Sequence, residues 1–158
     1  MAEEATQMST STTATSTLRW SPAAGHDMEF VGVSQSGHGM VIDTGEGNHG
    51  MSPFEMLGLA LGGCTAMDVI GILQKKRQRV TGYEIVVDTE RALVIPKVAT
   101  AFRVTHIVRG FGLDRVAVQR AVELSREKYC SVGLTLRAAV PIVDVIEIVE
   151  EAEVAAKV

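Results

Sequence analysis

The chain has 158 residues, of which 46% are hydrophobic and 22% are charged, as is typical of a globular protein. Its formal net charge of -4 does not offer the clustered cations that a polyanion requires, so we expect no nucleic-acid partner. A domain of this length can fold without a disulfide or a metal. Stability alone therefore does not explain the two cysteines.

The N-terminal stretch 1–16 begins with acidic side chains and continues in Ser and Thr. This stretch lacks the basic start and the apolar core of a secretory signal. We therefore expect a disordered tail over 1–16, followed by a single cytoplasmic domain over 17–158.

Short β-rich segments separated by turn-forming residues occupy the region 17–43. Their spacing predicts an antiparallel meander. The Gly- and Asn-rich stretch 44–51 then predicts a loop of the kind that can carry a functional site.

A helix begins after this loop with explicit sequence signals. Ser52 suits the N-cap, Pro53 suits the first helical position, and Glu55 lies three residues after Ser52. Together they form a capping-box pattern.

The stretch 56–73 is apolar on every side of a helical wheel, which predicts a helix buried on most of its surface. The cation-rich segment 75–79 follows it, and its positive charges stabilise the negative, C-terminal end of the helix dipole. A membrane span is the alternative. The glycines, Asp68 and the short length favour a helix inside a protein.

The rest of the chain alternates strands with helices. Period-two alternation predicts strands, and an amphipathic stripe of Val118, Ala121, Val122 and Ser125 predicts a helix. The expected elements are strands over 82–90, 99–110 and 141–150, a helix over 113–130, and a helical turn or short helix over 131–139. This order favours an α+β fold with antiparallel sheet.

A helix that is apolar all round needs more cover than one small twisted sheet provides. A second copy of the same chain is the simplest source of that cover. The sequence therefore predicts a homodimer.

The two cysteines, Cys64 and Cys130, lie far apart in the sequence without a CxxC pair, and the four histidines follow no ligand rhythm. No zinc pattern is present, so we expect neither a metal nor a cofactor. In a reducing compartment we expect Cys64 and Cys130 to be buried thiols or redox and catalytic groups and not a structural disulfide.

Cys64 and Asp68 are four residues apart and share one helical face. The acid opposes a thiolate unless a cation intervenes, so activation of Cys64 requires a basic group from elsewhere. The candidates are Arg19, His26, His38, Arg103, His106 and Arg109. Non-catalytic roles are the alternatives for three residues. Cys64 could serve as a small hydrophobic side chain, Glu55 as a helix cap alone, and Asp68 as a cap for a neighbouring loop.

Two motifs together carry a family resemblance. The run SPFEMLGLALGGCTAMDV, which contains Cys64, and the later run LSREKYCSVG, which contains Cys130, resemble the OsmC and organic hydroperoxide resistance superfamily in their order and spacing. The likeness is greatest to its less characterised branch, in which a P-x-E-x-L run leads to GGC-x-A-x-D. It implies an intertwined α+β homodimer, with curved antiparallel sheets wrapped around two central helices.

The resemblance also implies a chemistry and its partners. Cys64 would be the peroxidatic cysteine that attacks an organic hydroperoxide, and Cys130 the resolving cysteine that captures the sulfenic acid as a disulfide. An external thiol, for example of the lipoyl type, would regenerate both cysteines.

One departure from the family pattern concerns the activating groups. The best-known peroxidases have Glu directly after Pro, holding an Arg beside the thiolate. Here Phe54 follows Pro53 and Glu55 comes one place later, while His26 or Arg19 stands nearest to the family's Arg. Two hypotheses follow: a thiol-dependent peroxidase, or a dimeric small-molecule binding protein whose cysteines only pack its cavity.

Overall fold

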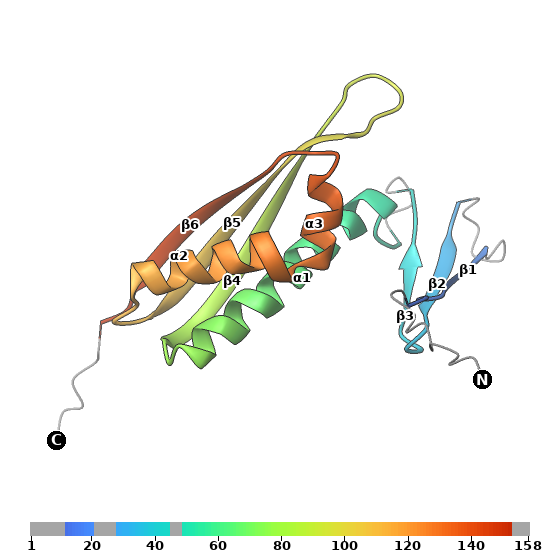
Figure 1. The fold of residues 1–158 in the computed structure, drawn as a ribbon. Helices are drawn as coiled ribbons and strands as arrows, with labels where there is room; N and C mark the ends of the chain where they lie inside the picture. Colours follow the sequence, from blue (N-terminus) through green and yellow to red (C-terminus); the bar gives the residue numbers. More distant parts are fainter. Residues whose placement is uncertain (1–11, 21–27, 45–48, 153–158) are drawn as a thin grey trace, which may run out of the picture. The chain divides into compact units, whose positions relative to one another are not determined.

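The computed structural model of the chain describes residues 12–20, 28–44 and 49–152. The chain divides into two compact units, Met1–Glu55 and Met56–Val158, where the sequence predicts one domain. Each unit has its own three-stranded sheet, and the helices follow the first sheet in the chain (Figure 1). His26, residues 1–11 of the predicted tail and residues 45–48 of the predicted loop lie outside the described residues.

The first unit contains the predicted meander. Its strands are β1 (Ser16–Trp20), β2 (Phe30–Ser34) and β3 (Gly39–Ile42), and both pairings are antiparallel. Gly37 has a φ of 84° in the turn between β2 and β3, a conformation that glycine adopts at no steric cost. The predicted meander over 17–43 is confirmed.

The first helix, α1 (Pro53–Lys75), starts at the predicted capping box. The Ser52 backbone N–H and hydroxyl both donate to Glu55 Oε2 at 2.7 Å. The Glu55 N–H donates to Ser52 Oγ at 3.3 Å. These reciprocal bonds satisfy backbone donors that a helix end otherwise leaves unpaired.

The sheet of the second unit combines antiparallel and parallel pairing. Its strands are β4 (Arg79–Arg91), β5 (Ala99–Phe111) and β6 (Ile142–Glu150), in the order β4-β5-β6. β4 runs antiparallel to β5, as predicted, but β6 runs parallel to β5. The expectation of purely antiparallel sheet is wrong here, because a crossover over 112–141 returns the chain to the end at which β5 began.

This crossover is helical. It consists of α2 (Arg115–Leu124), a π-helical turn η2 (Ser125–Tyr129) and α3 (Ser131–Arg137). The four residues of the predicted α2 stripe are all buried. The predicted helix 113–130 differs at its end: the Cys130 N–H donates to Ser125 O, five residues earlier, which widens the last turn by one residue.

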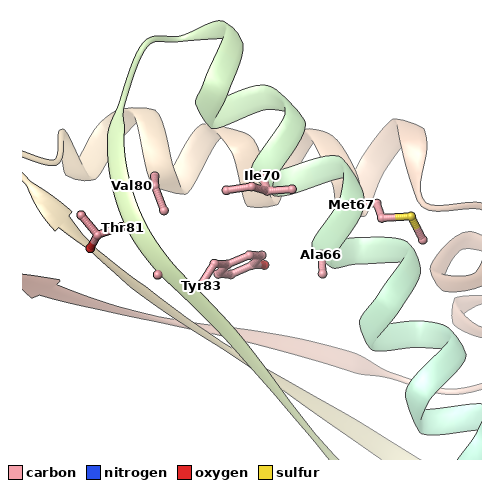
Figure 2. A pocket seen from close by; sticks show the side chains of 7 residues that line it. Ala66, Met67, Ile70, Val80, Thr81 and Tyr83 are labelled. Atoms are coloured by element: carbon pink, nitrogen blue, oxygen red, sulfur yellow. The ribbon is translucent and has the colours of Figure 1, made fainter.

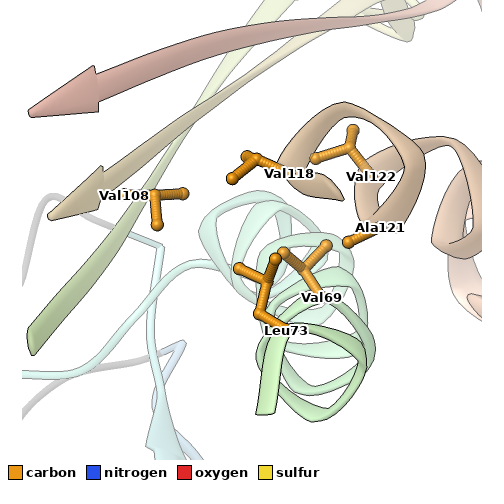
Figure 3. Close-up of a cluster of buried hydrophobic side chains, with 6 residues drawn as sticks. All are labelled: Val69, Leu73, Val108, Val118, Ala121 and Val122. Carbon is orange, nitrogen blue, oxygen red and sulfur yellow. The ribbon is translucent and has the colours of Figure 1, made fainter. Parts of the chain in front are cut away.

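The core of the second unit lies between the sheet and the helices. Figure 3 shows one cluster, in which Val69 and Leu73 of α1 meet Val108 of β5 and three residues of α2: Val118, Ala121 and Val122. A second cluster contains Leu61, Phe102, Val104 and Cys130. α1 is therefore a core helix of this unit.

α1 has a second, open face. The helix is long and apolar enough to cross a membrane. An 18-residue window of α1 has a mean hydropathy of 1.8, yet only 28% of this window is buried within the chain. Leu59 and Met67 are 60% and 72% exposed, and they share a helical face with Gly63 and Ile70. We call Leu59, Gly63, Met67 and Ile70 the α1 apolar stripe.

Candidate functional site

The two cysteines meet although they lie far apart in the sequence. Cys64 lies three turns into α1, and Cys130 lies between η2 and α3. The Sγ atoms of both residues and a carboxylate oxygen of Asp68 all lie within 4.8 Å of one another. Both thiols are free, with Cys64 half-buried and Cys130 buried.

Cys130 occupies a defined hydrogen-bonded position. It caps α3: its Sγ accepts the Gly133 N–H at 3.2 Å and the Thr65 hydroxyl at 3.4 Å. Burial raises the pKa of the Cys130 thiol, contact with Cys64 adds to the rise, and the two donors oppose it. The structure therefore keeps Cys130 protonated to a higher pH than an ordinary cysteine.

Asp68 lies one turn after Cys64 on the same face of α1. Its Oδ2 accepts the Ser125 hydroxyl at 2.9 Å, from the first residue of η2. Within the part of the chain that the structure describes, no ion pair reaches Asp68 or either cysteine. The bond from Ser125 to Asp68 joins the side chains of α1 and η2.

The cysteine pair also has an apolar side, opposite in character to Thr65 and Asp68. Leu61, Phe102 and Val104 pack with Cys130 in one buried cluster, and Cys64 contacts it from the edge. This packing shields Cys130 from water and Cys64 in part.

The predicted supporting residues have separate positions. The hydrogen bonds of Ser52, from its backbone N–H and then its hydroxyl, lower the pKa of the Glu55 carboxyl, so this side chain serves the cap of α1. Arg19 is exposed on β1 in the first unit. His26 lies outside the described residues.

The other candidate cations that the structure describes also have positions of their own. Arg103 is exposed on β5, Arg109 pairs with Glu84 at 3.6 Å, and His38 contacts Ser36 Oγ at 3.0 Å. None of these contacts involves the cysteine pair.

His106 belongs to a buried polar network on the second sheet. Its Nδ1 lies 2.7 Å from the Tyr83 hydroxyl on β4, and its Nε2 lies 3.4 Å from Asp144 Oδ1 on β6. Burial, followed by the charge of Asp144, raises the pKa of Tyr83. His106 thus links three strands.

Sequence reasoning missed several residues of these two groups. Thr65, Ser125 and Gly133 hold Cys130 and Asp68, and Tyr83 and Asp144 hold His106. The only available signal was the period-two pattern of the strands, which assigns each of Tyr83, His106 and Asp144 to one face of its own strand. Strand register, which brings them together, is not written in the local sequence.

A separate concavity lies along the open face of α1. It has a volume of about 390 Å³ and apolar walls. Its lining residues are Ala66, Met67 and Ile70 of α1 and Val80, Thr81, Gly82 and Tyr83 of β4. Figure 2 shows Ile70 between the two elements, on the side of Val80 and Tyr83. Met67 and Ile70 belong to the α1 apolar stripe, so the concavity and the stripe form one continuous surface.

Comparison with known proteins identifies the family. Residues 45–143 match the family described as OsmC-like protein. Protein YhfA of Escherichia coli strain K12 is 45% identical over 122 residues, which cover 77% of this chain and 91% of that protein.

Solved structures agree in fold. A hypothetical protein from Aquifex aeolicus VF5 is 25% identical with a TM-score of 0.78, covering 90% of this chain and 100% of that one. The organic hydroperoxide resistance protein OhrB of Bacillus subtilis is 18% identical with a TM-score of 0.55, covering 87% and 98%; this likeness concerns the fold alone. From the family match and the identity to YhfA, we conclude that the chain belongs to the OsmC-like family.

Proposed function

We propose that this protein is a thiol-dependent peroxidase for organic hydroperoxides. The observation that carries the proposal is the pair of free thiols, Cys64 half-buried and Cys130 buried, with Sγ atoms no more than 4.8 Å apart. An S–S bond is about 2.05 Å long, so the two sulfurs would approach each other by at most about 2.8 Å when a disulfide forms.

The reaction has three balanced steps. The Cys64 thiolate attacks the peroxide, takes one oxygen as sulfenic acid and releases an alkoxide, which gains a proton to become the alcohol. The Cys130 thiol then displaces water from the sulfenic acid and forms a disulfide. An external dithiol, for example of the lipoyl type, finally reduces this disulfide and is itself oxidised.

The positive charge that favours the Cys64 thiolate is part of the proposal. Arg19 and His26 are the residues of this chain nearest in sequence to the family's Arg. A permanent guanidinium charge at Arg19 would act at every physiological pH, whereas His26 would act only when protonated. The reducing cytoplasm would keep both thiols ready for reaction.

A homodimer completes the proposal. The α1 apolar stripe is exposed in one chain. Burial of such surface contributes about 25 cal/mol of favourable free energy for each Å², so it favours association. A second copy would supply the cover and enclose the concavity of about 390 Å³.

The decisive experiment counts thiols. Reduced protein is treated with one equivalent of cumene hydroperoxide, and we expect two thiols per chain to disappear as a Cys64–Cys130 disulfide forms, seen by mass spectrometry. Cys64→Ser should abolish turnover, and Cys130→Ser should accumulate a sulfenic acid that dimedone traps. Two titratable thiols after the dose, together with full turnover of Cys64→Ser, would contradict the proposal.

A second candidate function is small-molecule binding in the concavity along α1. The supporting observation is its apolar lining and its separation from the thiols. A ligand would then raise the melting temperature of the Cys64→Ala variant as much as that of the unaltered protein. No shift with lipids, thiols or acyl compounds would contradict this alternative.

A further inference from the structure

Three metal-ligating side chains converge from two segments of the second unit. Cys64 and Asp68 come from successive turns of α1, and Cys130 comes from the start of α3. Their donor atoms all lie within 4.8 Å of one another. We propose that the reduced protein binds one thiophilic divalent cation, with Zn²⁺ as its reference ligand, through Cys64, Asp68 and Cys130.

The distances suit a tetrahedral cation. Bonds of about 2.3 Å to sulfur and about 2.0–2.2 Å to oxygen separate neighbouring ligand atoms by roughly 3.5–3.8 Å. The spacing of at most 4.8 Å exceeds this by about 1.3 Å at most, so the donor atoms would need to move only slightly toward a shared cation. Three protein ligands leave the fourth position to water.

The surrounding hydrogen bonds orient the ligands. Cys130 Sγ accepts bonds from Gly133 and Thr65, which stabilise a metal-bound thiolate and fix its direction. The Ser125 hydroxyl holds Oδ2 of Asp68, which leaves Oδ1 for a cation. Such outer contacts typically change metal affinity by about 10- to 100-fold.

The charges also favour a cation. Once both thiols lose their protons, two thiolates and a carboxylate would carry three negative charges, and no described side chain forms an ion pair with Asp68 or either cysteine. A divalent cation neutralises most of this charge, and the two thiol protons pass to water on binding. The pair of thiolates selects Zn²⁺ over Mg²⁺, which prefers oxygen ligands.

Metal and peroxide would compete for the same sulfur electrons. A peroxide that oxidises the occupied site would take two electrons from the two thiolates and two protons from water, giving the disulfide, an alcohol, water and free Zn²⁺. This consequence rests on the peroxidase proposed above, whereas Zn²⁺ binding by the reduced site does not.

The test uses reduced, untagged protein under argon, without peroxide. Zn²⁺ is titrated in competition with the indicator 4-(2-pyridylazo)resorcinol, and we expect one Zn²⁺ per chain. Co²⁺ should give the intense visible bands of tetrahedral coordination and a thiolate charge-transfer band in the near ultraviolet. Mg²⁺ in excess should displace neither ion.

Three variants and one control assign the ligands. Cys64→Ser, Cys130→Ser and Asp68→Asn should each weaken Zn²⁺ binding by at least about 10-fold. The control Asp88→Asn removes a carboxylate exposed on β4 and should leave binding unchanged. Thermal melts of the metal-free variants check that each one folds.

Protection of the native thiols provides a measurement that needs no variant. One equivalent of Zn²⁺ should slow the reaction of Cys64 with Ellman's reagent by at least about 10-fold. A stoichiometry of one Zn²⁺ per two chains, unchanged binding in Asp68→Asn, or no protection of Cys64 would each overturn the proposal. Failure of the peroxidase assay would leave these readouts intact, so the two proposals fail separately.

Discussion

At the scale of single residues, the two thiols differ in their surroundings. Cys64 is half-buried at the edge of an apolar cluster, and Cys130 is 1% exposed within it. Burial raises the pKa of Cys130, and the thiolate is the reactive form of cysteine. The two residues should therefore react with electrophiles at different rates.

Differential alkylation measures this difference. With iodoacetamide at about neutral pH, we expect Cys64 to react at least about 10-fold faster than Cys130, because Cys130 is both buried and protonated. Peptide mass spectrometry gives both rates. In urea the two rates should converge, and faster alkylation of Cys130 in the folded protein would contradict this interpretation.

Tyr83 carries a second residue-scale prediction. Its hydroxyl bonds to His106, so Tyr83→Phe should lower the free energy of unfolding by about 1–2 kcal/mol at neutral pH. The raised pKa of Tyr83 adds a pH dependence. The folded state holds the phenol protonated, whereas the unfolded chain releases its proton near pH 10, so stability falls as pH rises above about 10.

Urea unfolding at about pH 7 and above about pH 10 tests both effects. The alkaline loss of stability should be smaller in Tyr83→Phe than in the unaltered protein, because the variant lacks this titration. An equal loss in the two proteins would show that Tyr83 is not responsible.

At the scale of elements, the glycines of α1 define how closely it approaches the sheet. A Cβ at Gly62 would lie 3.1 Å from Val87 Cγ2 and 3.6 Å from Ile85 Cγ2, whereas a Cβ at Gly71 would meet nothing within 4 Å. Gly62 therefore allows close packing of α1 on β4, and Gly71 does not have this role.

Alanine at these two positions gives a matched comparison. Gly62→Ala should lower the free energy of unfolding by about 1–3 kcal/mol, because the Val87 side chain must give way by a few tenths of an ångström in a packed interface. Gly71→Ala should raise it by up to about 1 kcal/mol through helix propensity. Chemical denaturation measures both, and an equal effect of the two substitutions would argue against close packing at Gly62.

The sequence predicted the elements whose causes are local. Ser52 and Glu55 announce the start of α1, and the stripe from Val118 to Ser125 identifies the buried face of α2. Parallel pairing of β6 was not predictable, because it depends on the path of the whole crossover. The π-helical turn was not predictable either, because the composition of residues 125–129 does not distinguish a π-helical turn from an α-helix.

The candidate site was predictable only in part. The spacing of Cys64 and Asp68 places them on one face of a helix, and the family resemblance pairs Cys64 with Cys130. The roles of Thr65, Ser125 and Gly133 depend on contacts between distant segments. The complete burial of His106 likewise follows from strand register. The sequence identified His106 only as a candidate cation for Cys64, so its contacts with Tyr83 and Asp144 were not predicted.

At the scale of the whole molecule, the α1 apolar stripe determines the expected assembly. Met67 is 72% exposed on α1, and Val116 is 73% exposed on α2. The two side chains are equally accessible within one chain. Only Met67 lies on the stripe, which makes Val116 a matched control for the proposed dimer interface.

Glutamate substitutions distinguish the two surfaces. Met67→Glu places a charge in the proposed interface and should reduce the mass in light scattering from two chains to one. Val116→Glu adds the same charge in the first turn of α2, where an acid is favourable, and should remain a dimer. A Met67→Glu protein that stays dimeric would place the interface elsewhere.

The π-helical turn has a consequence for insertions and deletions. One hydrogen bond joins Ser125 O to the Cys130 N–H, so the residue that holds Asp68 and the second thiol are the two ends of a single ring. Removing one residue between them would replace this i→i+5 bond by the i→i+4 bond of an α-helix, which keeps the Cys130 N–H on Ser125 O and leaves Cys130 in nearly the same direction around the axis. The bond between the two ends of the ring, more than the number of residues inside it, therefore sets the position of the second thiol.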